Sequence, residues 1–168
     1  MTRKRLFVVI AVLALTATAA LAQIGEKPEL VLTLLPQKEM TVKDQDGKSR
    51  TEWQEVQSTQ PGDVLRYMIR YENKGKGEAK DATFVDPVPQ GTIYIGESAE
   101  GEGAEITFSL DGKTFRQAPL LTYKVRRADG SVTEHIATPE MYTHVQWKLS
   151  KPVPPGGTGS VSLKVLVR

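Results

Sequence analysis

His135 and His144 are the first residues to consider as metal ligands or as acid–base catalysts, since the chain has only two histidines. A metal site needs further ligands that converge on them, and no His-x-His spacing occurs. Nor does the Gly-x-Ser-x-Gly turn of serine hydrolases occur, and there is no cysteine to act as nucleophile or thiolate ligand. We therefore expect no enzyme, no catalytic residue, no metal site and no cofactor.

Two acidic segments could in principle bind calcium. Asp44 and Asp46 lie in Asp-Gln-Asp-Gly, which begins like a calcium loop, but the basic residues Lys48 and Arg50 follow where oxygen ligands should continue. This segment is better explained as a turn. Residues 97–105 hold four glutamates around two glycines. Mutual repulsion keeps such a loop open and solvated, so it predicts at most a weak calcium site.

Aromatic side chains could instead form a platform on which a sugar ring stacks. Trp147 shares a strand face with Val145 and Leu149, which predicts a core position. Trp53 alternates with Glu52 and Gln54, so we expect its ring to be half exposed. Trp53 is therefore the one aromatic candidate for contact with a ligand or protein partner.

The elements that must position these residues are short strands, because apolar and polar residues alternate between closely spaced turn signals. Residues 64–72 are clearest, with Leu65, Ile69 and Tyr71 on one face. Similar alternation occurs at 145–149 and 160–167, and weaker candidates lie at 29–35, 51–56, 82–85, 92–96, 106–110, 121–126 and 131–136. About ten strands without a helical stripe predict an all-β, Ig-like antiparallel β-sandwich.

Three Asp-Gly pairs predict extra hairpins, since both residues tolerate the positive φ of tight turns. They begin at Asp46, Asp111 and Asp129. Residues 139–142 are expected to form a single helical turn and nothing longer. No repeat or linker divides the chain, so residues 23–168 are predicted to form one domain.

The first expected strand, residues 29–35, is the most apolar segment after the N-terminal region. Leu30, Leu32 and Leu34 fall on one face and Val31 and Leu35 on the other, so both faces could be buried. Such a strand either completes the chain's own sheet, which we favour, or joins the open edge of a neighbouring molecule, as in pilus-like fibres.

The N-terminal residues have the three-part layout of a secretory signal peptide. Arg3, Lys4 and Arg5 precede an apolar stretch, and Ala20 and Ala22 provide the small residues that signal peptidase requires. We expect residues 1–22 to be cleaved. Their removal takes away three basic and no acidic side chains, which changes the net charge from +2 to −1. That balance argues against a nucleic-acid partner, and cleavage leaves no stable membrane span.

Several motifs occur in an order that resembles a known family. Pro61-Gly62-Asp63 leads into a strand with two tyrosines that ends at Asn73, and a turn from Asp86 with Pro89 follows. A Gly-Thr-x-Tyr strand, a strand with a tryptophan and a Pro-Gly-Gly turn complete the set, at residues 91–94, 147 and 155–157. This arrangement resembles the conserved-repeat domain of bacterial and archaeal envelope proteins, domain-of-unknown-function family eleven.

The resemblance implies an immunoglobulin-like domain that is exported to the cell envelope, and it supplies no catalytic residues. The chain carries a single copy of the motif set. The sequence thus predicts a non-catalytic structural or protein-interaction module, periplasmic or at the cell surface, with a protein partner or self-association. A strand-exchanging fibre subunit and a carbohydrate-binding or hydrolase accessory domain remain the alternatives.

Overall fold

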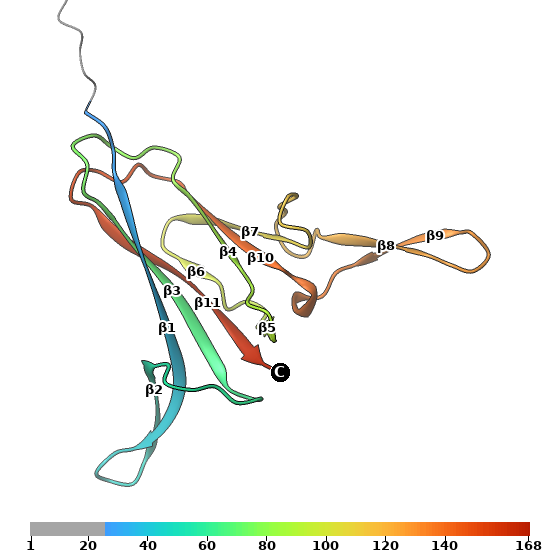
Figure 1. The fold of residues 1–168 in the computed structure, drawn as a ribbon, viewed down its shortest axis with the longest axis horizontal. Coiled ribbons are helices and arrows are strands. Elements are labelled where there is room, and N and C mark those ends of the chain that lie inside the picture. Colours follow the sequence, from blue (N-terminus) through green and yellow to red (C-terminus); the bar gives the residue numbers. More distant parts are fainter. Residues whose placement is uncertain (1–25) are drawn as a thin grey trace, which may run out of the picture.

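The fold is an all-β sandwich, and the antiparallel sheets predicted from the alternation are confirmed. The computed structural model describes residues 26–168, so the expected signal peptide and its cleavage site lie outside the described residues. The larger sheet has the order β2-β1-β3-β11-β5, with β6 also paired to β11, and the smaller sheet has the order β4-β10-β7 (Figure 1). A separate two-stranded sheet joins β8 and β9.

The strands of the larger sheet come from both ends of the described chain. They are β1 (Leu30–Lys43), β2 (Ser49–Glu55), β3 (Val64–Asn73), β5 (Thr92–Tyr94), β6 (Glu100–Gly101) and β11 (Thr158–Val167). The smaller sheet contains β4 (Thr83–Pro87), β7 (Ala104–Ser109) and β10 (His144–Leu149). The third sheet contains β8 (Thr122–Arg126) and β9 (Val132–Ile136), and a 3-10 turn, η1 (Pro139–Met141), follows it as expected.

The core lies between the inner faces of the two main sheets, meaning the faces that they turn toward each other. From the larger sheet, β3 and β11 contribute apolar side chains at every second residue, and β10 does so from the smaller sheet. Trp147 is fully buried at its centre, as predicted from its neighbours on the same face. The buried apolar side chains of these three strands are Leu65, Ile69, Tyr71, Val145, Trp147, Leu149, Val161, Leu163 and Val165.

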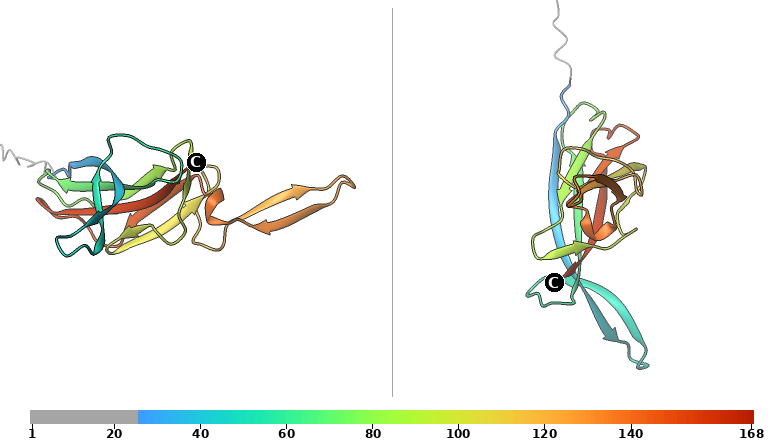
Figure 2. Two further views of the ribbon diagram at one scale, coloured as in Figure 1. Left: turned by 90° about the horizontal axis from the view of Figure 1, so that it is seen from below. Right: turned by 90° about the vertical axis from the view of Figure 1, so that its right-hand side faces the viewer.

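Two hairpins project from the sandwich, and we call them arms. The β1–β2 arm comprises residues 37–55 and turns at Gly47, where φ is +77°. The β8–β9 arm comprises residues 122–136 and turns at Gly130. Figure 2 shows that each arm extends beyond the packed sheets in its own direction. The Asp-Gly pairs at Asp46 and Asp129 predicted both arms. After the third pair, Asp111-Gly112, the returning chain contacts β7 through a single bridge between Phe108 and Arg116.

β1 differs from expectation because it runs through Pro36 and ends at Lys43, although a strand ending at residue 35 was predicted. Proline removes a ladder hydrogen-bond donor, but an edge position tolerates this loss. β2 pairs with β1 only from Gln37 onward, so the outer edge of β1 at Pro36 has no partner strand among the described residues.

Candidate functional site: an open side of the sandwich

One side of the sandwich leaves part of the inner face of β1 uncovered. β1 pairs with β3 so that Leu32 lies opposite Tyr71 and Leu34 lies opposite Ile69. These pairs share the inner face, yet Ile69 and Tyr71 are buried whereas Leu32 and Leu34 are each 52% exposed. We call Leu32 and Leu34 the uncovered strip. The expectation that both faces of this segment are buried is wrong for these two residues.

The cause is the width of the smaller sheet. Its edge strand β4 lies over β3, where the Phe84 ring stacks on the Tyr71 ring with centroids 5.0 Å apart. Sheets pack about 10 Å apart and neighbouring strands lie about 4.8 Å apart, so one further strand beside β4 would be needed to cover β1. No strand among the described residues occupies that position.

Two unpaired strand edges therefore lie on the same side of the sandwich. The free edge of β4 belongs to the smaller sheet, and the outer edge of β1 over residues 30–36 belongs to the larger one. In the right-hand view of Figure 2, β1 runs along one outer edge of the sandwich. Free edges offer unpaired N–H and C=O groups to an added strand.

A carboxylate lies on the inner face close to this opening. Asp86 of β4 pairs across the strand with fully buried Val145, which places its side chain toward the larger sheet. Burial raises the pKa of Asp86, and His144 opposes the rise. The Asp86 charge in turn adds to burial in raising the pKa of Tyr67 on β3. No ion pair with Asp86 forms within residues 26–168.

At the start of β1, Asn73 fastens the strand to its surroundings. Its side-chain oxygen accepts hydrogen bonds from the N–H groups of Glu29 and Gly75, each at 3.0 Å. Its amide nitrogen donates to the carbonyls of Gly77 and Val153, each at 2.8 Å. Asn73 is fully buried, and one of its four side-chain hydrogen bonds holds Glu29, the residue before β1.

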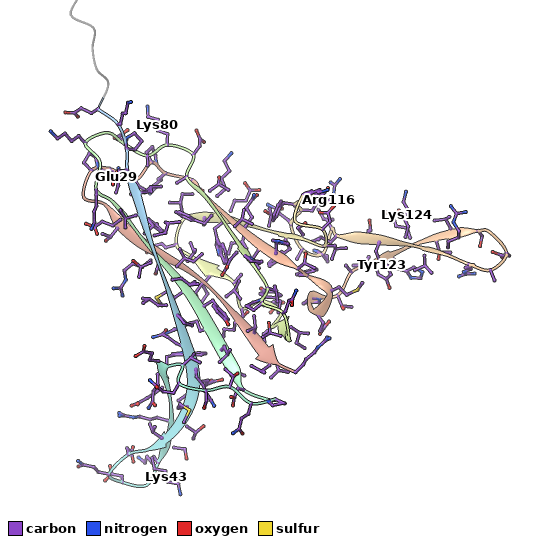
Figure 3. All side chains as sticks on the ribbon, in the orientation of Figure 1. Glu29, Lys43, Lys80, Arg116, Tyr123 and Lys124 are labelled. Atoms are coloured by element: carbon purple, nitrogen blue, oxygen red, sulfur yellow. The ribbon has the colours of Figure 1, made fainter. Side chains whose placement is uncertain are left out.

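The β8–β9 arm is the second region with exposed apolar side chains. Val132 and Ile136 of β9 are 50% and 65% exposed. The register places Lys124 and Arg126 of β8 on the same face of the arm as these two residues. Figure 3 shows Tyr123 and Lys124 on the arm, well outside the sandwich. Both long edges of this two-stranded sheet lack a partner strand among the described residues.

Trp53, the aromatic candidate from the sequence, lies on β2 at an intermediate exposure. The guanidinium carbon of Arg66 lies 4.5 Å from the centre of its ring, and the Lys164 ammonium lies 5.5 Å away. Arg66 is itself held by the side-chain oxygen of Gln37. Two cations thus already interact with the ring, which gives Trp53 a role within the fold whether or not it contacts a ligand.

A cavity of about 550 Å³ opens beside the N-terminal half of β11. Its wall includes the acidic segment around Glu100 and Glu102, together with Lys151 and Tyr71. Gly159 allows the close approach of Tyr71, because a Cβ there would lie 2.2 Å from the tyrosine hydroxyl oxygen. The cavity has the size of a small-molecule site, but its mixed charges favour no particular ligand class.

Within residues 26–168, no three His, Asp or Glu side chains are grouped as metal ligands. His135 lies on the β8–β9 arm beside Thr133, whereas His144 lies on β10 beside Thr143. Over the same residues, no helix is long and apolar enough to cross a membrane.

Comparisons with known proteins give no relative: no family model, no curated protein and no solved structure matches the chain. The resemblance to the envelope-repeat family therefore stays a prediction. The sequence identified Leu32 and Leu34 as a feature of interest, but it could not reveal that one face is open, because exposure depends on the width of the opposite sheet. The alternation around Val132 and Ile136 predicts a strand, but it carries no signal that this strand projects from the domain.

Proposed function

We propose that this chain is an exported, non-catalytic protein-interaction module of the cell envelope, and that it binds its partner by strand addition at the open side. The uncovered strip is the observation that carries the proposal. A charged N-terminal segment followed by an apolar one and two small residues supports export. Localisation to the periplasm or the cell surface follows from the same pattern.

Strand addition fits the open side for two separate reasons. A strand placed beside β4 gains main-chain hydrogen bonds along Thr83–Pro87. The same strand lies over β1, so every second side chain covers Leu32 and Leu34. Burying the exposed half of two leucines stabilises the complex by roughly 1–3 kcal/mol, at about 25 cal/mol per Å² of apolar surface.

A site-directed cross-linking experiment tests this binding mode. The chain has no cysteine, so Leu34→Cys introduces a unique thiol for a photo-activated cross-linker. Val85→Cys is the matched control, since Val85 is 45% exposed and lies on the outer face of β4. In exporting cells we expect a protein adduct from position 34 and none from position 85. Equal labelling from both positions, or none, would contradict the proposal.

A strand-exchanging fibre subunit is the second candidate, and the exposed leucines of β1 favour it. In that mode β1 would leave its own sheet and enter a neighbour. The nine-residue register of β1 with β3 supports pairing within the chain instead. Thr33→Cys and Arg70→Cys place two thiols on opposite exposed residues of these strands, and their disulfide would lock β1 in place. Strand exchange should then stop, whereas strand addition should continue.

A further inference from the structure

Asp86 places a carboxylate beside the free edge of β4. Its side chain points between the two sheets, because its cross-strand partner Val145 is fully buried on the inner face. Lys38, the cation on the inner face of β1, is already engaged, since its Nζ lies 2.7 Å from Oδ2 of Asp63. Within residues 26–168 no cation forms an ion pair with Asp86, so its charge at the opening is uncompensated there.

The main chain of β4 fixes how an added strand must bind. The Ala82 carbonyl and the Val88 N–H both bond toward β10. Because this direction alternates along a strand, the even-numbered residues from 82 to 88 bond toward β10, whereas Thr83 and Val85 direct their N–H and C=O groups to the free edge. An antiparallel strand bonded to Thr83 and Val85 therefore meets Asp86 in a non-hydrogen-bonded pair, where opposed side chains lie closest.

The side chain that an added strand places opposite Asp86 also lies over the uncovered strip. Phe84 stacks on Tyr71, and the Asp86 charge reaches Tyr67, further along β3. Leu34 lies opposite the residue midway between these two tyrosines. A lysine or arginine opposite Asp86 therefore covers Leu34 with its methylene stem while its charged end reaches the carboxylate.

We propose that Asp86 selects the strand that the open side accepts: an extended segment of a partner protein with a lysine or arginine opposite Asp86 and apolar side chains two residues to either side. This inference rests on the proposed function, since it names the chemistry of the partner for the same surface. Strand addition removes water from Asp86, and a carboxylate buried without a cation opposes binding. An inward-pointing charge on an edge strand also discourages pairing with neutral or acidic strands.

Matched synthetic peptides with blocked ends test this preference on the purified exported chain. The first, Ser-Val-Thr-Lys-Thr-Val-Ser, places valine, lysine and valine on one face of a strand and hydroxyl side chains on the other. The second, Ser-Val-Lys-Thr-Thr-Val-Ser, has the same composition but carries its lysine on the opposite face, because side chains alternate along a strand. The third replaces the lysine of the first peptide with glutamate.

Variants of the protein supply the other half of the test. Asp86→Lys reverses the charge and Asp86→Asn removes it, and circular dichroism checks that both fold. Should Asp86→Lys not fold, Asp86→Asn alone decides the question. Glu105→Lys makes the same change in net charge on β7, at the other edge of the smaller sheet, and it is the control for unspecific attraction.

Fluorescence anisotropy of end-labelled peptides gives the dissociation constants, and slower hydrogen exchange at Thr83 and Val85 locates the bound edge. We expect wild type and Glu105→Lys to bind the first peptide about tenfold more tightly than the second, and the glutamate peptide least. Asp86→Lys should prefer the glutamate peptide. Asp86→Asn should no longer distinguish lysine from glutamate.

Failure of every peptide to bind wild type overturns the inference, as does equal binding of the first peptide and either of the others. An advantage of the first peptide that survives in Asp86→Asn overturns it too. Binding that appears only in Asp86→Asn would show instead that Asp86 blocks the edge. The proposed function is separable from these results. If the peptides are not distinguished but the cross-linker at position 34 still captures an envelope protein, strand addition stands and the charge preference alone is wrong.

Discussion

β1 and β3 are neighbours in one sheet, but they differ in what covers the face that they share. β3 lies under the smaller sheet, so Ile69 and Tyr71 are buried, whereas the directly opposed Leu34 and Leu32 on β1 are half exposed. Both strands have apolar residues at the same positions of the pleat. The comparison teaches that a core position is created by the opposite layer and not by the strand's own sequence.

The largest effect is expected at the centre of the covered region. Trp147→Ala removes a fully buried indole and should lower the free energy of unfolding by about 3–5 kcal/mol, as measured by chemical denaturation. The indole N–H has no hydrogen-bond partner within residues 26–168, so the loss is one of packing. Trp147→Phe keeps a ring in place and should therefore cost clearly less than alanine. Equal losses would show that packing is not the cause.

Asn73 ends β3 opposite the start of β1. Asn73→Ala should lower the free energy of unfolding by about 3 kcal/mol. The substitution leaves four backbone groups without the Asn73 side chain, among them the carbonyl of Val153 in a buried hydrogen bond, and each unsatisfied buried group costs roughly 1–3 kcal/mol. Hydrogen exchange at the start of β1 should accelerate as well. Lys74→Ala is the neighbouring control, an exposed site expected to change stability by less than about 0.5 kcal/mol.

A matched pair of substitutions tests the comparison directly. Ile69→Ala should lower stability by about 2–5 kcal/mol, because its cavity would lie between two sheets. Leu34→Ala, on the opposed residue, should cost under about 1 kcal/mol in the monomer, since half of its side chain already contacts water. Denaturation at low protein concentration separates the two values. Similar losses would mean that β1 is covered in solution.

The smallest effect concerns charge at the boundary between the two regions. Burial raises the pKa of Asp86, so the folded state disfavours the charged carboxylate. At neutral pH this charge therefore lowers the free energy of unfolding. That loss of stability disappears as the pH falls through the raised pKa and the carboxylate takes up a proton. Asp86→Asn should therefore raise the melting temperature of the monomer at pH 7. The difference from wild type should vanish below the ordinary aspartate value of 3.8. A difference that persists in acid would assign the effect to shape instead of charge.

Much of the fold was predictable because local alternation fixes which side chains share a face. The pattern around Leu65 and Tyr71 predicted the inner face of β3, and the Asp-Gly pairs at Asp46 and Asp129 predicted both arms. These features depend on residues close together in the sequence. The passage of β1 through Pro36 was not predictable, because it depends on the absence of a partner strand at one edge.

The candidate site was only half predictable for a related reason. Leu32 and Leu34 were recognised as unusual, but their exposure follows from the three-stranded width of the smaller sheet, which no single segment encodes. Likewise, Val132 and Ile136 alternate as in any strand. Only the projection of their hairpin away from the core shows that they are available for contact.

The shared pairing of β1 and β11 with β3 also determines how the domain would carry load. Both strands are antiparallel to β3, so the start of β1 and the end of β11 lie at opposite ends of the sheet (Figure 1). Tension applied between these two points runs along the strands, at right angles to the hydrogen bonds between them. The bonds of both ladders are then strained together instead of opening one after another. A sheet loaded in this shearing geometry resists pulling.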